Sequence, residues 1–154
     1  MSTQTVTDLS IHKTLLISLD TKRAFEVFAH ELGDWWPLES HSQGGEKAET
    51  AILEGRLGGS MHEVSEAGET EAWATVKRWE PPSSIVLDWH VNPDKPTTDL
   101  EVCFAADSEG TRVDLYHRGW EAFGDDASAA YAEYNIGWDF VLGHYLIAVG
   151  TVKP

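Results

Sequence analysis

The chain has 154 residues, of which 42% are hydrophobic and 10% aromatic, and this composition suits a single domain (1–154) with a buried core. Its 26 acidic residues against 11 Lys and Arg give a formal net charge of −15, which opposes binding to nucleic acids and to anionic lipid surfaces. No window approaches the roughly 20 apolar residues of a membrane span, and one cysteine excludes an internal disulfide. We therefore expect a cytoplasmic protein with no membrane insertion, whose residues 1–9 form a flexible tail.

A strand followed by a helix is predicted first along the chain. The segment Ile11–Leu19 is rich in Leu and Ile, and Asp20 or Thr21 can accept hydrogen bonds from the first N–H groups of a helix. Apolar residues then recur at spacings of three and four, which predicts one buried helical stripe made of Ala24, Phe25, Val27, Phe28 and Leu32. Gly33 and Pro37 are expected to end this helix.

A polar, Gly-containing loop from Glu39 to Lys47 comes next, carries His41, and has the composition of a mobile rim or lid. Beyond it the hydrophobic pattern has a period of two, which predicts an antiparallel meander of six further strands. These strands are Glu49–Leu53, Ser60–Ser65, Thr70–Trp79, Ser84–Val91, Thr98–Ala106 and Thr111–Gly119. From Ala127 to Gly150 the period returns to 3.6, which predicts a long C-terminal helix. Its apolar face comprises Tyr131, Tyr134, Trp138, Val141, Leu142, Tyr145 and Val149.

Strand alternation indicates which side chains face inward beneath this final helix. Glu63 and His117 share the inner face with apolar residues, so the alternation predicts a mostly apolar cavity with a few polar fixing points. The apolar members of this face include Met61, Leu87, Trp89, Phe104 and Leu115.

Two positions leave alternatives open. Regular alternation in the third of the six strands places Trp73 and Trp79 on the outer face, where exposed aromatic residues favour a homodimer, whereas a β-bulge would turn them inward. Gly137 inside the long helix either permits close approach to the sheet or allows a bend, at a cost of about 1 kcal/mol relative to Ala.

Short motifs lie on the expected elements along nearly the whole chain. They are Arg23-Ala24-Phe25-Glu26-Val27-Phe28, Trp35-Trp36-Pro37, Gly58-Gly59 followed by Glu63, Trp79-Glu80-Pro81-Pro82, Leu87 with Trp89-His90, Gly110-Thr111-Arg112-Val113, His117-Arg118-Gly119-Trp120 and Gly137-Trp138. In these motifs the chain resembles the SRPBCC superfamily of START-like domains, and within it the activator of heat-shock-protein-90 ATPase homologue-like group. The resemblance implies an α+β helix-grip fold, in which a curved seven-stranded antiparallel sheet wraps a long C-terminal helix and two short helices follow the first strand.

Members of this superfamily bind lipids, steroids and polyketides, and some catalyse cyclisation or dehydration, so the resemblance does not fix the function. We favour binding of a small, largely apolar or aromatic molecule between the sheet and the C-terminal helix. The first alternative is a cyclase- or dehydratase-type enzyme that uses Glu63 and His117 for proton transfer. The second is a co-chaperone-like role in the stress response with a chaperone partner, which only the name of the group suggests.

We expect the ligand to contact one set of aromatic, apolar and polar residues. The set is Trp36, His41, Met61, Glu63, Leu87, Trp89, Phe104, Leu115, His117, Trp120, Tyr134, Trp138 and Tyr145. Several of them also have a structural interpretation: Glu63 pairs with a backbone group or an arginine, His117 is a hydrogen-bonded core histidine, and His41 is simply exposed to solvent. The four tryptophans and Tyr134 could likewise serve only in packing. No nucleotide-binding motif is present and the histidines are scattered, so we expect no cofactor and no metal.

Overall fold

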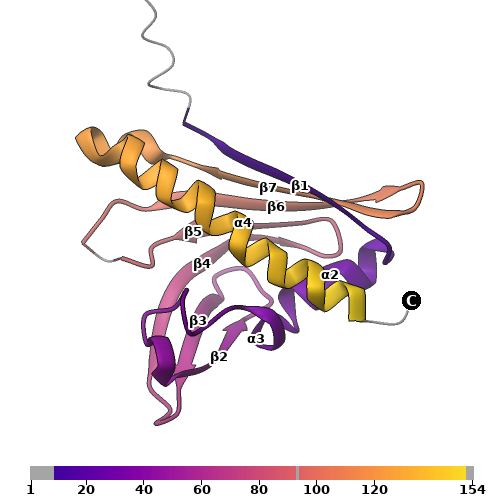
Figure 1. The fold of residues 1–154 in the computed structure, drawn as a ribbon, viewed down its shortest axis with the longest axis horizontal. Helices are drawn as coiled ribbons and strands as arrows, with labels where there is room; N and C mark the ends of the chain where they lie inside the picture. The colour runs from indigo at the N-terminus through magenta and orange to yellow at the C-terminus, as the bar shows by residue number, and fades with distance from the viewer. Residues whose placement is uncertain (1–8, 93, 152–154) are drawn as a thin grey trace, which may run out of the picture.

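The computed structural model describes residues 9–92 and 94–151. Seven antiparallel strands form one sheet, in the order β1-β7-β6-β5-β4-β3-β2 (Figure 1). The strands are β1 (Ile11–Ile17), β2 (Ala48–Leu53), β3 (Ser60–Ser65), β4 (Thr70–Glu80), β5 (Ser84–Trp89), β6 (Thr98–Asp107) and β7 (Gly110–Arg118). Of the predicted tail over residues 1–9, only Leu9 lies among the described residues, and it packs half-buried against the core.

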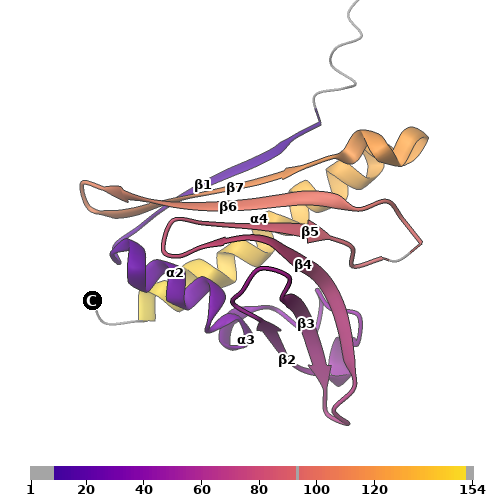
Figure 2. The ribbon, with the colours of Figure 1, turned by 180° about the vertical axis from the view of Figure 1, so that it is seen from behind.

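The helices cover one face of this sheet. They are α2 (Thr21–Ala29), α3 (Leu32–Trp35), the 3-10 turns η1 (Gly45–Lys47) and η2 (Trp120–Asp126), and the long α4 (Ala127–Thr151). The helix α4 runs diagonally across the sheet in Figure 1 and lies behind it in the reverse view of Figure 2. This arrangement confirms the predicted helix-grip fold, with two short helices after the first strand. Within residues 9–92 and 94–151, no helix combines the length and apolar character needed to cross a bilayer.

The boundary between the two short helices differs from the prediction. The side chain of Asp20 caps α2 as expected and accepts the Arg23 backbone N–H at 2.8 Å. However, α2 ends at Ala29, and Gly33 lies inside the following helix α3 rather than ending the first one. A Cβ atom at Gly33 would lie 2.1 Å from Oγ1 of Thr50, so glycine is needed where α3 meets β2.

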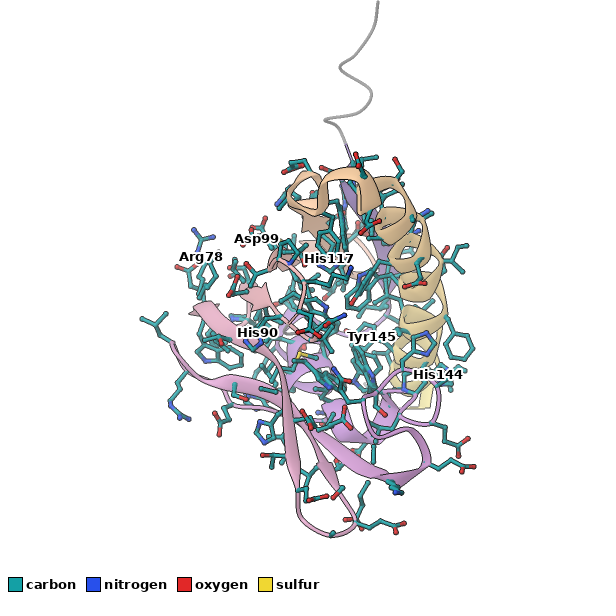
Figure 3. All side chains as sticks on the ribbon, turned by 90° about the vertical axis from the view of Figure 1, so that its left-hand side faces the viewer. Arg78, His90, Asp99, His117, His144 and Tyr145 are labelled. Atoms are coloured by element: carbon teal, nitrogen blue, oxygen red, sulfur yellow. The ribbon has the colours of Figure 1, made fainter. Side chains whose placement is uncertain are left out.

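Side chains on the inner faces of the strands form the core, as alternation predicts. The residues Met61, Glu63, Leu87, Trp89, Leu100, Val102, Phe104, Val113, Leu115 and His117 are all buried. In Figure 3, His117 and Tyr145 point into the space between the sheet and α4, whereas Arg78 and Asp99 lie on the outer side of the sheet. The Tyr145 hydroxyl donates a 2.8 Å hydrogen bond to the Ala24 carbonyl and so ties α4 to α2.

Two β-bulges in β4 decide the position of its tryptophans. The register with β3 shifts between Met61 and His62, and the register with β5 shifts between Val76 and Arg78. Trp73 is consequently turned inward and is 1% exposed, and Trp79 packs edge-on against the Phe25 ring of α2. The outward position that regular alternation favours is therefore wrong, and these two tryptophans form no exposed surface for self-association.

Candidate functional site

A cavity of about 440 Å³ lies where α4 crosses the sheet. The loop after α3, the first half of β4 and the end of β5 close its other sides. Its lining comprises Trp36, Ser40, His41, Ser42, Gln43, Trp73, Trp89, Val91, Glu133, Tyr134, Gly137, Trp138 and Val141. Ligand pockets in proteins commonly have volumes of about 300–1,000 Å³, so this cavity has room for a small molecule.

Four tryptophans that line the cavity form a closed circuit of neighbouring indole rings. The ring centroids lie 5.0 Å apart for Trp36–Trp73, 6.4 Å for Trp73–Trp89, 5.9 Å for Trp89–Trp138 and 6.0 Å for Trp36–Trp138. The rings are tilted or edge-on to one another, which is the favourable geometry for aromatic pairs. All four side chains are buried, so they form the inner wall, while the more exposed residues of the loop and α4 form the rim.

Every indole N–H of this circuit donates to an acceptor of the protein itself. The acceptors are the His41 carbonyl for Trp36 (2.7 Å), the Glu63 carboxylate for Trp73 (2.7 Å), the Tyr134 hydroxyl for Trp89 (3.1 Å) and His117 Nδ1 for Trp138 (3.0 Å). These bonds fix the ring orientations. The wall therefore offers a ligand aromatic surface rather than N–H donors.

Glu63 lies directly behind this wall, on β3. One carboxylate oxygen accepts the Trp73 indole N–H and the Gln43 backbone N–H at 2.7 and 2.6 Å, and the other accepts the Gly44 backbone N–H at 2.7 Å. The side chain is 2% exposed and does not line the cavity. Its observed role is to hold the loop at Gln43 and Gly44 against the sheet, since charge-assisted hydrogen bonds of this kind are among the strongest in proteins.

The loop from Ser40 to Gln43 forms one side of the cavity mouth. Its His41 ring stacks on Phe140 of α4, with centroids 5.0 Å apart and an interplanar angle of 18°. The Gln43 side-chain amide donates to the Val91 carbonyl on the opposite side. The loop is thus attached to α4, to β3 and to the segment after β5.

Burial lowers the pKa of His41, and a repulsive interaction with His144 on α4 lowers it further. The imidazole is accordingly neutral near pH 7. It contributes an aromatic ring and a hydrogen-bonding nitrogen to the rim, but no positive charge.

His117 is completely buried on β7. Its Nδ1 accepts the Trp138 indole N–H, so the neutral ring carries its proton on Nε2 and donates it to Thr98 Oγ1 at 2.7 Å. Burial lowers its pKa to about 3. Both ring nitrogens are occupied, and His117 does not line the cavity.

Tyr134 contributes a hydroxyl group to the inner part of the cavity. Its oxygen accepts the Trp89 indole N–H, which leaves its own proton for a further acceptor. Burial raises the pKa of Tyr134 more than this hydrogen bond lowers it, so the group is a neutral donor. A ligand oxygen or nitrogen in the cavity is one such acceptor.

Gly137 leaves space in the cavity rather than permitting contact with the sheet. A Cβ atom there would meet only His41 Nε2 at 3.9 Å, which is an ordinary contact distance. Any larger side chain would extend into the cavity that Gly137 lines.

The predicted ligand-contacting residues separate into three groups in the structure. Trp36, His41, Trp89, Tyr134 and Trp138 line the cavity together. Glu63 and His117 lie behind its aromatic wall, and Trp120 packs against the His117 ring from η2, with centroids 4.5 Å apart. The remaining four apolar residues and Tyr145 are buried elsewhere in the core: Met61, Leu87, Phe104, Leu115 and Tyr145.

Sequence reasoning missed several residues of the lining. Trp73 faces the cavity because of a bulge that alternation does not reveal. The loop residues Ser40, Ser42 and Gln43 are placed by hydrogen bonds within the loop and, for Gln43, to Glu63 and Val91, and no periodic pattern marks them. Val141 lies on the predicted apolar face of the long helix, so the helical periodicity could have identified it as a lining residue. Among the residues that the structure describes, no group of three or more His, Cys, Asp or Glu is arranged to hold a metal ion.

The family model described as activator of Hsp90 ATPase homolog 1-like protein matches residues 22–144. No curated protein matches the chain.

Solved structures share the fold. Protein MLL2253 from Mesorhizobium loti is similar with a TM-score of 0.70 and 14% identity, covering 94% of this chain and 99% of that one. Protein SA2116 of unknown function from Staphylococcus aureus has a TM-score of 0.67 and 11% identity, with coverage of 92% and 93%. The anthrahydroquino-gamma-pyrone synthase Txn09 is 28% identical, with a TM-score of 0.55 and coverage of 78% and 82%.

Proposed function

The chain belongs to the activator of Hsp90 ATPase homolog 1-like family of the SRPBCC superfamily, and within that fold we propose that it binds a small, largely apolar or aromatic molecule in the cavity beneath α4. The circuit of four indoles carries this proposal. Its rings are fixed by protein hydrogen bonds, so the aromatic wall is formed before a ligand arrives and little side-chain entropy remains to be lost on binding.

The polar groups at the mouth support the same function. The Tyr134 hydroxyl has a proton for a ligand acceptor, and Glu133 and the loop serines lie at the rim. An apolar wall with a few polar groups is the usual composition of small-molecule sites. The name of the 28% identical relative Txn09 denotes a fused aromatic compound, which further supports an aromatic ligand.

Neither alternative function has a specific observation in its favour. Proton transfer by Glu63 and His117 would require both groups to reach one bound molecule, but neither lines the cavity, and each is hydrogen-bonded to protein partners that include residues of the lining itself. A chaperone partner would be indicated by a matching surface, and the family description alone does not provide one.

Two glycines of α4 give a matched test of ligand binding. Gly137 lines the cavity, whereas a Cβ atom at Gly143 meets no atom within 4 Å. The measurement is quenching of tryptophan fluorescence by 2-naphthol, a neutral aromatic probe. We expect Gly137→Leu to weaken binding about tenfold or more by filling the cavity, and Gly143→Leu to leave it within about twofold.

Equal affinity of the two leucine variants would contradict binding in this cavity. Thermal unfolding provides a second readout, because a probe that binds only the folded chain raises its melting temperature, and the rise grows with the ratio of probe concentration to dissociation constant. That shift should be present in Gly143→Leu and absent in Gly137→Leu.

A further inference from the structure

The electrostatic character of the cavity indicates the charge of its ligand, provided that the proposed binding function is correct. Among the described residues that line the cavity, none is Lys or Arg. The basic side chain that does line it, His41, is neutral near pH 7 because burial lowers its pKa. Glu133 at the rim carries a negative charge, and the whole chain has a formal net charge of −15.

A second negative charge, the Glu63 carboxylate, lies behind the aromatic wall and contacts the cavity-lining residue Trp73. Glu63 is buried and accepts three N–H groups, two of them from the lining residues Gln43 and Trp73. No Lys, Arg or His of the described chain forms an ion pair with it. Its charge is therefore solvated by hydrogen bonds but not neutralised, and in a poorly hydrated interior it acts over longer distances than in water.

The aromatic wall transmits this charge to the cavity. Trp73 donates its indole N–H to the Glu63 carboxylate, and hydrogen bonding to an anion increases the electron density of the ring. Because all four indole N–H groups are directed at protein acceptors, a ligand meets the carbon rings, and where it lies over a ring it meets the electron-rich π face rather than the positive edge. Such surfaces attract cations, most strongly when they belong to tryptophan.

We propose that the cavity selects an organic cation, in which an ammonium or a charged heteroaromatic ring is carried on an apolar frame and lies against the Trp36–Trp73–Trp89–Trp138 circuit. A neutral molecule of the same shape gains the hydrophobic contact but not the attraction of the rings and of Glu63. An anion meets hydrogen-bond donors such as the Tyr134 hydroxyl, but no positively charged side chain.

Three probes of nearly the same shape test this inference. They are para-hydroxyphenyl-trimethylammonium, which is positive, para-tert-butylphenol, which is neutral, and para-tert-butylbenzoate, which is negative. Affinity is measured by calorimetry on the unmodified chain at physiological ionic strength. We expect the cation to bind about fivefold or more tightly than the phenol, and the benzoate to bind more weakly than both.

Two variants distinguish the effect of the charge next to the cavity from the effect of the protein's overall negative charge. Glu63→Gln removes the charge behind Trp73, and Glu54→Gln removes one charge at a partly exposed site whose Oε1 accepts the Ser60 backbone N–H. The advantage of the cation over the phenol should fall at least about twofold in Glu63→Gln and stay unchanged in Glu54→Gln. In Gly137→Leu, all binding of the cation should be lost.

The outcomes distinguish this inference from the binding function on which it rests. If the phenol binds as tightly as the cation and Gly137→Leu abolishes both, the cavity is a ligand site but the preference for cations is disproved. If no probe binds the unmodified chain, the binding function and the inference both fail. The comparison of probes on the unmodified chain decides the matter even if Glu63→Gln does not fold.

Discussion

The indole Nε1 of Trp138, on α4, donates a 3.0 Å hydrogen bond to Nδ1 of His117, on the inner face of β7. This bond joins the long helix to the sheet and requires an imidazole without a proton on Nδ1. The protonated form of His117 is therefore incompatible with the packing of α4, and burial disfavours it as well.

The stability of the fold should depend on pH through His117. Because its pKa is lowered to about 3 in the folded chain and is near 6.5 when unfolded, the unfolded chain binds more protons below pH 6.5. The free energy of unfolding should therefore fall as the pH falls from 6.5 towards 3. Between pH 6.5 and about 5, we expect this residue to account for a loss of about 1.5 kcal/mol.

Denaturant unfolding at these two pH values measures this loss, and His117→Gln is the comparison because glutamine does not titrate. The variant should be less stable than the unmodified chain at pH 6.5, and its stability should change less between the two pH values. An unchanged pH dependence in His117→Gln would show that other groups are responsible.

Glu63 should control the order of the loop at the cavity mouth. Glu63→Gln keeps the shape but replaces one acceptor oxygen with an amide that faces N–H donors, so we expect a cost of about 1–3 kcal/mol in the free energy of unfolding. Hydrogen exchange of the Gln43 and Gly44 amides should accelerate by more than global destabilisation explains. Glu54→Gln, which affects one backbone contact and a surface ion pair with Arg56, should cost less than about 1 kcal/mol. Unchanged exchange at Gln43 and Gly44 would contradict a loop-holding role.

Gly33 and Gly143 should respond in opposite directions to replacement by alanine. At Gly33 a Cβ atom would collide with Thr50 Oγ1 and touch the Ala51 carbonyl, so separation of α3 from β2 should cost about 1–3 kcal/mol. At Gly143 the space is open, and alanine should stabilise α4 by up to about 1 kcal/mol. Thermal unfolding of both variants measures this difference. A Gly33→Ala chain as stable as Gly143→Ala would show that α3 and β2 adjust without cost.

The sequence predicted most of the fold because its signals are periodic and local. Alternation in β3, β5, β6 and β7 placed the apolar inward-facing residues correctly, since side chains of a regular strand point to opposite faces in turn. The 3.6-residue period located α4 and its buried face, and Asp20 marked the start of α2.

The candidate site was only partly predictable. Trp36, Trp89, Tyr134 and Trp138 were expected to meet a ligand and do line the cavity, because each lies on an element with regular periodicity or beside one. Trp73 depends on the match between β4 and its neighbours, since a bulge forms where two strands pair and not within one strand. The hydrogen-bond donors to the Glu63 carboxylate are likewise distant from it in sequence. The sequence therefore could not show that this carboxylate is held by three N–H groups of the protein.

The sequence by itself determined the order and type of the elements and an aromatic interior, because hydrophobic periodicity is a property of each segment alone. The helix-grip arrangement of these elements was implied by the resemblance to the SRPBCC superfamily. The tertiary structure alone decided which aromatic rings enclose the cavity and which polar groups remain for a ligand. Hydrogen bonds such as Trp73 to Glu63 and Trp138 to His117 connect different elements, and their existence depends on how those elements pack.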